Sequence, residues 1–408
     1  ERSRVQGPPT GLACSDMLRF ITSGESHGPG LVATVEGLPS GVPVDSAGIA
    51  SELARRRLGF GRGPRMRLEK DELEILGGVR FGRTLGGPVT ILIRNTEWPR
   101  WRERMSPDVI DDEAASAIKR ETAPRPGHAD LVGMQKYDTH DARDILERAS
   151  ARETAARTIV GHLAKQLLSL IGVDVFSHVV AIGGITVPDA APLPAPEDLA
   201  AIDESQVRVF DGASEAAMIG EIEAAKADRD TLGGVVEVLA YGLPPGLGSH
   251  VHWDRKLDGQ LAGALMSIQA IKAVEIGDGL QQAANRGSAA HDEIVVDEDT
   301  AGGYGRRSNR AGGLEGGMTT GDILRIKAVM KPIATIMRPL ETVDVDTRTS
   351  EKAFRERSDV CAVPAAGVVA EQMVAYVLAN EAIRKFGGDT VGDFADAHGA
   401  YLARLEAF

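Results

Sequence analysis

The sequence is poor in the residues that build disulfide frameworks, zinc clusters and base-stacking surfaces. Only 2 of its 408 residues are cysteines, Cys14 and Cys361, and their wide separation supports neither a disulfide framework nor a zinc site. Aromatic residues make up 4% of the chain, too few for a surface that stacks the bases of a single strand. No apolar run approaches the ~20 residues of a membrane-spanning helix. We therefore expect a cytoplasmic protein with no metal site and no membrane association.

Basic residues are also fewer than acidic ones, so a local cluster of basic residues is informative. The formal net charge is -13, which argues against a general affinity for nucleic acid. Residues 55–67, RRRLGFGRGPRMR, nevertheless carry six arginines and no acid. Arginine binds carboxylates and phosphates through a planar fork, and glycines suit a loop that folds over a ligand. The segment predicts an anion-binding loop; the alternatives are a solvated basic turn and a contact with RNA or DNA.

Hydrophobic periodicity predicts a mixed α/β protein of the α+β type. Strand-like patterns cover 31–35, 73–76 and 89–93, and helical patterns cover 47–57, 142–171, 254–274 and 367–386. Residues 1–16 lack the apolar segment of a secretory signal, so we expect a disordered leader or upstream extension before one domain at 17–408. The similar segments LVATVEGLPSG (31–41) and VEVLAYGLPPG (236–246) indicate either an internal duplication or repeated use of a convenient turn.

Two histidines lie in glycine-containing turns. GESHGPG at 24–30 presents His27 just after an apolar run, and RPGHAD at 125–130 places His128 beside a glycine, with Arg125 three residues earlier. Histidine titrates near neutral pH, and glycine lets the backbone approach a ligand closely. Both turns therefore suit proton transfer, and the alternative for each is an ordinary polar turn.

Three further segments suit phosphate-bearing ligands. Ser150 and Glu153 form the S-x-x-E pattern of a capped helix start, where free N–H groups favour an anion. LEGGMT at 314–319 and MKPIAT at 330–335 supply a glycine turn and a lysine before a rigid proline, without matching a nucleotide-binding fingerprint. Plain capping and ordinary turns are the alternatives. His250 and His252 lack a third ligand, so we infer no metal site from them.

Together these segments resemble the chorismate synthase family. Three long stretches carry the likeness in order: GESHGPGLVATVEGLP from Gly24, ERASARETAARTIVGHL from Glu147 and RSDVCAVPAAGVVAE from Arg357. The segments RRRLGFGRG, RPGHADLVG and MKPIAT are similar as well, so the resemblance covers nearly all of 17–386. It implies a β-α-β sandwich with internal pseudo-symmetry, assembled as a homotetramer.

The resemblance also implies an activity. Members are carbon–oxygen lyases that remove phosphate from 5-enolpyruvylshikimate 3-phosphate by anti 1,4-elimination to give chorismate, the last common step of aromatic amino acid biosynthesis in the shikimate pathway. The reaction requires reduced FMN without net redox change. NADPH enters only indirectly, as one source of electrons for the flavin, and the absence of an NADPH fingerprint favours an external flavin reductase. The substrate carries two carboxylates and a phosphate, which suits an arginine loop.

Residue roles follow from the same resemblance. His27 would act as general acid beside the departing phosphate, His128 would lie by the N1/C2 carbonyl edge of the reduced flavin, and Asp359 would assist transfer of the C6 proton to N5. Substrate binding falls to Ser26, His27, Arg56, Arg62, Arg125, Arg152, Arg357 and Ser358. Flavin binding falls to Ser150, Ala151, Arg152, Gln269, Ala270, Gly316, Lys331, Pro332, Ile333, Ala334, Thr335 and Arg357.

Two positions depart from the pattern of relatives. Ala149 replaces a serine of many members, and Gln269 stands where a relative has an asparagine that contacts the flavin. Two other functions compete with the lyase. One is a non-enzymatic phosphate-ligand or RNA-binding protein that uses the arginine loop, and the other is phosphoryl transfer through His27 without a flavin.

Overall fold

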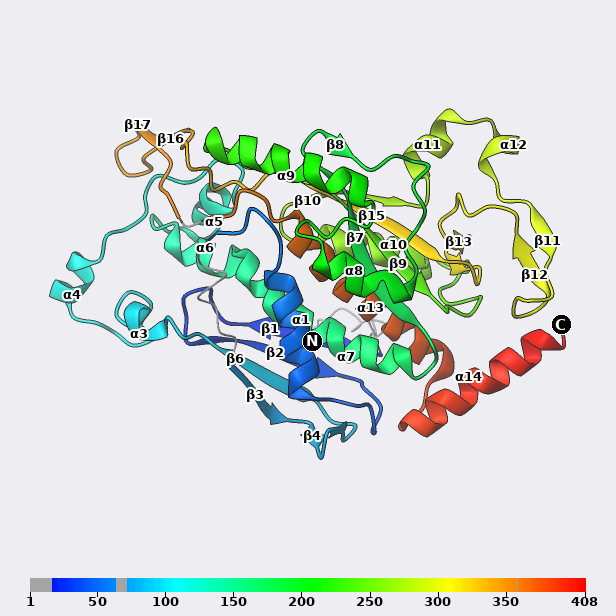
Figure 1. Ribbon diagram of the computed structural model, residues 1–408. Helices are drawn as coiled ribbons and strands as arrows, with labels where there is room; N and C mark the ends of the chain where they lie inside the picture. Colours follow the sequence, from blue (N-terminus) through cyan, green and yellow to red (C-terminus); the bar gives the residue numbers. More distant parts are fainter. Residues whose placement is uncertain (1–16, 64–71, 357) are drawn as a thin grey trace, which may run out of the picture.

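The computed structural model describes residues 17–63, 72–356 and 358–408, and it forms a β-α-β sandwich with helices between two antiparallel sheets (Figure 1). The first sheet runs in the order β1 (Arg19–Ser23), β2 (Gly30–Glu36), β6 (Val89–Arg94) and β3 (Glu72–Gly77). The second runs β10 (Ile271–Ile276), β15 (Leu324–Met330), β9 (Gly234–Tyr241), β7 (Asp174–Ile182) and β8 (Ile185–Thr186). The predicted α+β class is confirmed. The predicted leader at 1–16, with Cys14, and also Arg65, Arg67 and Arg357 lie outside the described residues.

The first sheet forms because its strands alternate between apolar and polar residues. In β2 and β6 every second side chain is buried, and the register pairs Ala33 with Ile91 and Val35 with Val89 across the two strands. Alternation of this kind gives a sheet one face that packs on the core and another that faces outward. The apolar face packs against α7 (Thr154–Ser169), which confirms the strands predicted at 31–35 and 89–93.

The central layer contains α1 (Ser46–Arg57), α7 and α13 (Val363–Phe386), with α10 (Leu257–Met266) packed against α13. Helices α7 and α13 cross closely at Gly161, where an added Cβ would lie 2.2 Å from the Cβ of Gln372. By length and composition α13 could cross a membrane, but 94% of its most apolar window is buried inside the protein. Its apolar character is explained by its position between the two sheets (Figure 1).

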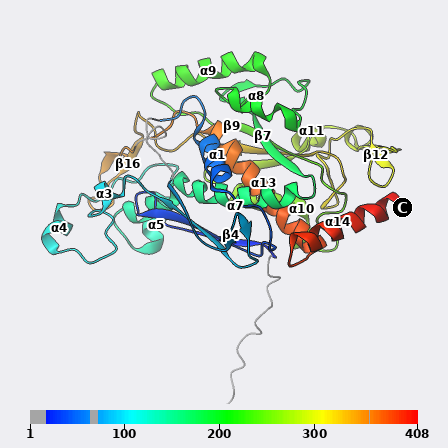
Figure 2. The ribbon, with the colours of Figure 1, turned by 60° about the horizontal axis from the view of Figure 1, so that its bottom comes forward.

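The second sheet is covered on both faces. Val236, Val238 and Ala240 of β9 belong to the main core with the helical layer, while Leu239 packs on the opposite face with Phe176 and Ile202. That outer face is covered by η2 (Pro196–Asp198) and α8 (Leu199–Glu204), and α9 (Gly212–Ala227) packs against β7 and β8. Figure 2 shows α8 and α9 on one side of β7 and β9, with α13 on the other. A strand buried on both faces loses simple alternation, so β9 consists mainly of buried side chains.

Two predicted helices are shorter than their apolar patterns. The pattern at 142–171 is divided into α6 (Arg143–Ala149), the short η1 (Ala151–Glu153) and α7, because Ser150 has an extended backbone (ψ of 140°). The pattern at 254–274 yields η3 (Trp253–Arg255) and α10, after which the chain turns at Gln269 and enters β10. Both interruptions occur where the chain lines the cavity described below.

The remaining elements lie around the sandwich (Figures 1 and 2). They are β4 (Val79–Arg80), β5 (Arg83–Thr84), α3 (Trp98–Trp101), α4 (Asp112–Ala117), α5 (Asp130–Tyr137), α11 (Gly279–Ala284), α12 (Gly287–Ala290), β11 (Ile294–Val296), β12 (Tyr304–Arg306), β13 (Leu314–Glu315), β14 (Met318–Thr319), β16 (Glu341–Val343), β17 (Ser350–Lys352) and α14 (Val391–Glu406). Figure 2 shows α14 and the C-terminus on the opposite side of the molecule from α3 and α4.

The repeated GLPxG segment has the same local structure at both sites. It follows β2 in the first sheet and β9 in the second, and its first residue, Gly37 or Gly242, has a positive φ of 96° or 73°. An added Cβ would lie 1.8 Å from the carbonyl oxygen of Met17 at the first site and 2.1 Å from that of Gly172 at the second. Both positions therefore require glycine for the same steric reason.

Candidate active site

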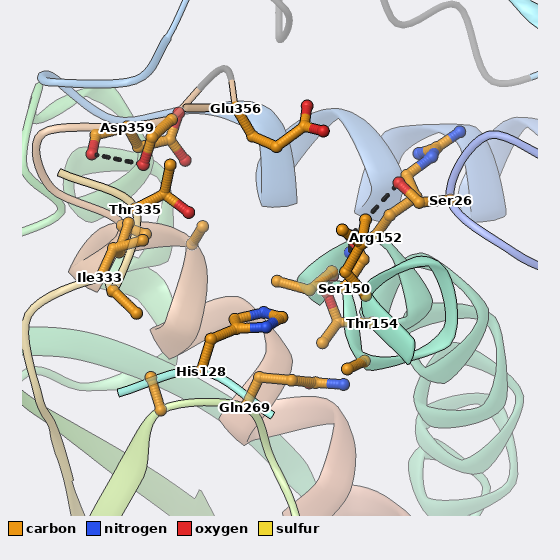
Figure 3. A pocket seen from close by; sticks show the side chains of 18 of the residues that line it. Ser26, His128, Ser150, Arg152, Thr154, Gln269, Ile333, Thr335, Glu356 and Asp359 are labelled. Atoms are coloured by element: carbon orange, nitrogen blue, oxygen red, sulfur yellow. Dashed lines mark hydrogen bonds between the residues drawn. The ribbon is translucent and has the colours of Figure 1, made fainter. Parts of the chain in front are cut away.

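A cavity of about 620 Å³ lies where the interrupted helices meet the loops after β1 and β15. This volume lies within the range of ~300–1,000 Å³ that is usual for ligand-binding cavities. Figure 3 shows side chains from distant segments around one open space, with Ile333, Thr335 and Asp359 across from Ser150 and Arg152, and with His128 and Gln269 below. The cavity therefore brings together most of the residues that the sequence singled out.

The imidazole of the first histidine, His27, is paired with a buried carboxylate. Its Nδ1 lies 2.9 Å from Oε1 of Glu147 and its backbone N–H donates to Oε2 at 2.8 Å. The ring also stacks on Trp101, with the two centroids 3.8 Å apart and the planes at 27°. Burial alone would raise the pKa of Glu147, but hydrogen bonds and charge from His27, with a hydrogen bond from Arg143, hold that pKa below its ordinary value.

The second histidine, His128, has a matching arrangement. Its Nδ1 lies 2.5 Å from Oδ1 of the fully buried Asp130. Arg125 donates to the same carboxylate through Nε at 2.8 Å and to Thr335 Oγ1 at 2.8 Å. Burial would raise the pKa of Asp130, but hydrogen bonds from His128 and Arg125 lower it to about 2. Asp130 is thus ionised at neutral pH and fixes both His128 and Arg125.

The predicted capping box at Ser150 forms only in part. Ser150 Oγ accepts from the backbone N–H of Arg152 at 3.2 Å and donates to Ser26 Oγ at 3.2 Å. The carboxylate of Glu153 does not return to the Ser150 N–H; it accepts hydrogen bonds from Thr22, Arg157 and Gln269 instead. The capped turn therefore begins a short 3₁₀ segment whose residues Ser150, Ala151 and Arg152 line the cavity.

The arginine-rich segment divides between core and cavity. Arg55 faces the interior, where it pairs with Asp203 and Glu371, so the prediction of an anion-binding loop is wrong for this residue. Arg56 lines the cavity and donates to Thr154 Oγ1 at 2.9 Å and to the Ala151 carbonyl at 3.1 Å.

Arg62 lies at the cavity beside Asp359. Its Nη1 is 3.2 Å from Asp359 Oδ2, and the other carboxylate oxygen accepts from the backbone N–H of Gly63 at 2.6 Å. Asp359 therefore fastens Arg62 and Gly63 to the loop before α13. Ser358 lines the same wall of the cavity.

The wall made by Gln269, Ala270 and the MKPIAT segment is held by backbone contacts. Ala270 has a left-handed backbone, with φ of 67°, and its carbonyl accepts from the Lys331 N–H at 3.0 Å. A positive φ at alanine is strained and persists where surrounding contacts impose it. Lys331 Nζ donates to the Gly127 carbonyl at 2.6 Å, which joins this wall to the His128 turn. The side-chain oxygen of Gln269 is buried and has no hydrogen-bond partner among the described residues.

The lining carries an excess of positive charge. Among the described residues, five cationic side chains line the cavity, from Arg56, Arg62, Arg125, Arg152 and Lys331, against the two carboxylates of Glu356 and Asp359. Since the whole chain has a net charge of -13, this concentration marks the cavity as a site for anions.

Two predicted site residues of the described chain, Pro332 and Gly316, do not line the cavity, and Arg357 lies outside the described residues. Pro332 lies beside the cavity, between lining residues of the MKPIAT segment. Gly316 is in the β13–β14 turn, next to the beginning of α10, whereas Gln269 follows its end. At ~1.5 Å per residue the 10 residues of α10 separate them by about 15 Å. Among the described residues no group of three or more His, Cys, Asp or Glu side chains suits a metal ion.

Comparisons with known proteins agree on one family. The family model described as chorismate synthase matches residues 18–383. The chain belongs to the chorismate synthase family. The proteins named chorismate synthase from Thermobifida fusca (strain YX) and Acidothermus cellulolyticus (strain ATCC 43068 / DSM 8971 / 11B) are 62% and 60% identical to it, each over 95% of this chain and 99% of the relative. A solved structure titled "Crystal Structure of Chorismate Synthase" matches with a TM-score of 0.77 and 40% identity, over 96% of this chain and 99% of that chain.

Membership in the chorismate synthase family makes the chain an enzyme, a carbon–oxygen lyase that acts on a small molecule. The family is flavin dependent. The comparisons support this activity and give no support to the RNA-binding and phosphoryl-transfer alternatives. The β-α-β sandwich that the sequence resemblance implied is the fold observed.

Several residues of this site were not singled out from the sequence. Asp130 lies two residues after His128, where an acid near a histidine could have been noted. Glu147 lies far from His27 in the sequence and gave no such signal. Trp101 and Glu356 gave no local signal, because only the tertiary fold brings α3 and the loop after β17 to the cavity. Ala149 also lines the cavity, so the missing serine hydroxyl changes its surface directly.

Proposed function

We propose that the cavity binds 5-enolpyruvylshikimate 3-phosphate and reduced FMN and catalyses the anti 1,4-elimination of phosphate to give chorismate. The observation that carries this proposal is the presence of two carboxylate-held histidines in one cationic cavity. Elimination of phosphate requires a proton donor for the leaving group and positive charge around it. His27, His128 and the lining arginines supply groups of both kinds.

The residues present fit a flavin. A planar ring system needs apolar walls, and Leu146, Ile268, Ala366 and Val369 provide them. The side-chain oxygen of Gln269 has no hydrogen-bond donor among the described residues, and an N–H group of a flavin ring would supply one. Lys331 and the capped turn at 150–152 suit the phosphate of FMN. Gln269 retains an amide where a relative has asparagine, so the chemistry of that contact is conserved in kind.

Substrate binding is assigned to Ser26, His27, Arg56, Arg62, Arg125, Arg152, Arg357 and Ser358, as the resemblance implies. Arg125 is held in place by Asp130 and Thr335, so its guanidinium is already oriented before a ligand arrives. Arg56 is likewise held by Thr154 and Ala151. Pre-oriented guanidinium groups bind carboxylate or phosphate without the entropy loss of ordering a long side chain.

The proposed roles of the three catalytic residues follow from their surroundings. His27 holds a proton for the departing phosphate oxygen. His128, fixed by Asp130, holds a proton at the flavin edge of the cavity. Asp359, fixed by Gly63 and Arg62, supports removal of the C6 proton. Reduced FMN, when bound, supplies electron density to the substrate as the C–O bond breaks.

Assembly and cellular context remain part of the proposal. We expect residues 17–408 to be one domain, because the main core is continuous through both sheets and the helical layer. The family resemblance favours a cytoplasmic homotetramer supplied with reduced flavin by an external reductase, with NADPH as an indirect electron source. Gly316 and Arg357 stay predictions as flavin contacts.

The proposal is tested by phosphate release from 5-enolpyruvylshikimate 3-phosphate under anaerobic conditions, with reduced FMN, with oxidised FMN and without flavin. We expect release only with reduced FMN. Release at the same rate without flavin, with phosphohistidine at His27, would support phosphoryl transfer instead. Salt-dependent RNA binding with no release under any condition would support the binding-protein alternative.

A further inference from the structure

Glu147 of α6 holds the part of the loop that carries His27. The backbone carbonyl of Glu147 accepts from the Ser26 N–H at 3.0 Å, and its side chain accepts from the His27 N–H at 2.8 Å. The same carboxylate lies 2.9 and 3.0 Å from Nδ1 of the His27 ring. Glu147 thus fixes both the backbone of the loop and the direction in which the imidazole points.

These contacts decide which ring nitrogen faces the cavity. Nδ1 is turned toward Glu147, while His27 itself lines the cavity, so Nε2 is the nitrogen left on the cavity side. No hydrogen bond to Nε2 is found within the described part of the chain. Trp101 covers one face of the ring, which leaves the imidazole little freedom to rotate away from this position.

The carboxylate of Glu147 is itself held in the ionised form. Its side chain is 2% exposed, and Arg143 Nη1 donates to Oε1 at 3.0 Å. Other charged groups near the pair are Glu121 and Glu356, which both pair with Arg143. Arg104 and Arg143 lie over Trp101, and Arg152 lines the same cavity as His27. The nearest negative charge to the ring is therefore Glu147, and an opposite charge at hydrogen-bond distance favours the protonated imidazole.

The same arrangement occurs at the second histidine. There the ring is paired through Nδ1 with Asp130, and Asp130 is paired with Arg125, just as His27 is paired with Glu147 and Glu147 with Arg143. The two sites come from different loops and helices and share no residue. The same histidine–carboxylate–arginine arrangement thus occurs twice in one cavity. We infer that both imidazole rings need a fixed orientation beside a negative charge.

We propose that Glu147 is the positioning residue that holds the His27 ring beside an opposite charge and directs its Nε2–H at the leaving phosphate. The inference rests on the proposed function. In the step it serves, the C6 proton is removed with the support of Asp359 and the C6–H electron pair enters the new diene of the ring. The C–O bond breaks, its electron pair goes to the phosphate oxygen, and the Nε2 proton moves to that oxygen. His27 is left neutral with its remaining proton on Nδ1, hydrogen-bonded to Glu147, and is reprotonated from solvent before the next turnover.

The test compares Glu147→Gln with Glu147→Asp and with Arg148→Gln as a matched control. Glutamine removes the charge at nearly constant size, and aspartate keeps the charge on a shorter side chain. Arg148 is the neighbouring residue on the same helix and hydrogen-bonds to Thr22 and Gly24 at the start of the loop, without contact to His27. It controls for a general loosening of the loop.

Activity is measured as kcat/KM against pH, with 5-enolpyruvylshikimate 3-phosphate and reduced FMN under anaerobic conditions. We expect the alkaline limb of Glu147→Gln to move about 1–2 pH units lower, the usual effect of losing an opposite charge at this distance. At pH values above this limb, kcat/KM falls tenfold for each further pH unit. Glu147→Asp should recover part of the shift, and Arg148→Gln should keep the wild-type limb.

A second measurement needs no turnover. In protein labelled at histidine, the NMR signals that vanish in His27→Ala identify the His27 ring, and their titration midpoint should lie lower in Glu147→Gln than in the wild type or Arg148→Gln. Equal midpoints and an unmoved alkaline limb in Glu147→Gln would overturn the inference. An inactive wild type with the midpoint shift present would overturn the proposed function and leave the effect of Glu147 on His27 established.

Discussion

Replacing Asp130 with asparagine should cost a defined amount of stability that depends on pH. The Asp130 carboxylate is fully buried and accepts from Arg125 Nε at 2.8 Å, from Arg125 Nη2 at 3.1 Å and from His128 Nδ1. Its pKa of about 2 lies below the ordinary 3.8, and at ~1.4 kcal/mol per unit this difference stabilises the folded protein by ~2.5 kcal/mol at pH 7. Asparagine lacks the charge and should lose at least that amount.

The sign of the pH dependence follows from the lowered pKa. The stabilisation is complete above the ordinary pKa of 3.8 and is lost as pH falls through the folded-state pKa of about 2. The difference between wild type and Asp130→Asn should therefore fall from ~2.5 kcal/mol at pH 7 to roughly half of that at pH 3.

Urea unfolding at pH 7, 5 and 3 measures this difference directly. Asp138→Asn is the matched control, because Asp138 is exposed at the other end of α5 and its left-handed backbone, with φ of 54°, accepts asparagine. Equal stability of Asp130→Asn and wild type at pH 7, or a difference that does not shrink toward pH 3, would refute the reasoning.

Three further predictions concern the cavity. His27→Ala should lower turnover about 100-fold or more, because it removes the proton donor, while FMN affinity stays nearly unchanged; wild-type turnover would exclude His27 from catalysis. Arg62→Gln should raise the substrate KM at low salt and flatten its rise with added salt, because one screened charge contact is lost; an unaltered salt dependence would contradict this. Asp359→Asn keeps an acceptor for the Gly63 N–H and should slow turnover at constant substrate affinity; loss of FMN binding in this variant would point to a structural role.

Local pattern was enough to predict the elements that bury one face. The alternation in β2 and β6 and the apolar pattern of α1 and α13 gave the correct element types, with boundaries within a few residues. The pattern failed at 142–171 and 254–274, where apolar periodicity continues across a break. The first helix breaks at Ser150 and α10 ends before Gln269. Both residues are held by tertiary contacts, Ser150 to Ser26 and Gln269 to Glu153, which a local pattern does not contain.

The candidate site was predicted as a set of residues but not as an arrangement. Short motifs identified His27, His128 and the cationic segments, because histidine, glycine and arginine have distinctive chemistry. The partners that orient them could not be predicted in the same way. Trp101 of α3 contacts His27 only in the folded protein. Arg55 points into the core because it forms an ion pair there with Glu371 of α13. Sequence alone does not separate an arginine that binds a ligand from one that neutralises a buried acid.

The most direct measurement quantifies phosphate and chorismate together in one anaerobic reaction of the full chain with 5-enolpyruvylshikimate 3-phosphate and reduced FMN. A lyase that uses this cavity for elimination should form the two products in equal amounts, at a rate that falls to background when the flavin is oxidised. Phosphate without chorismate, or equal rates with reduced and oxidised flavin, would contradict the assignment of the cavity to flavin-dependent elimination.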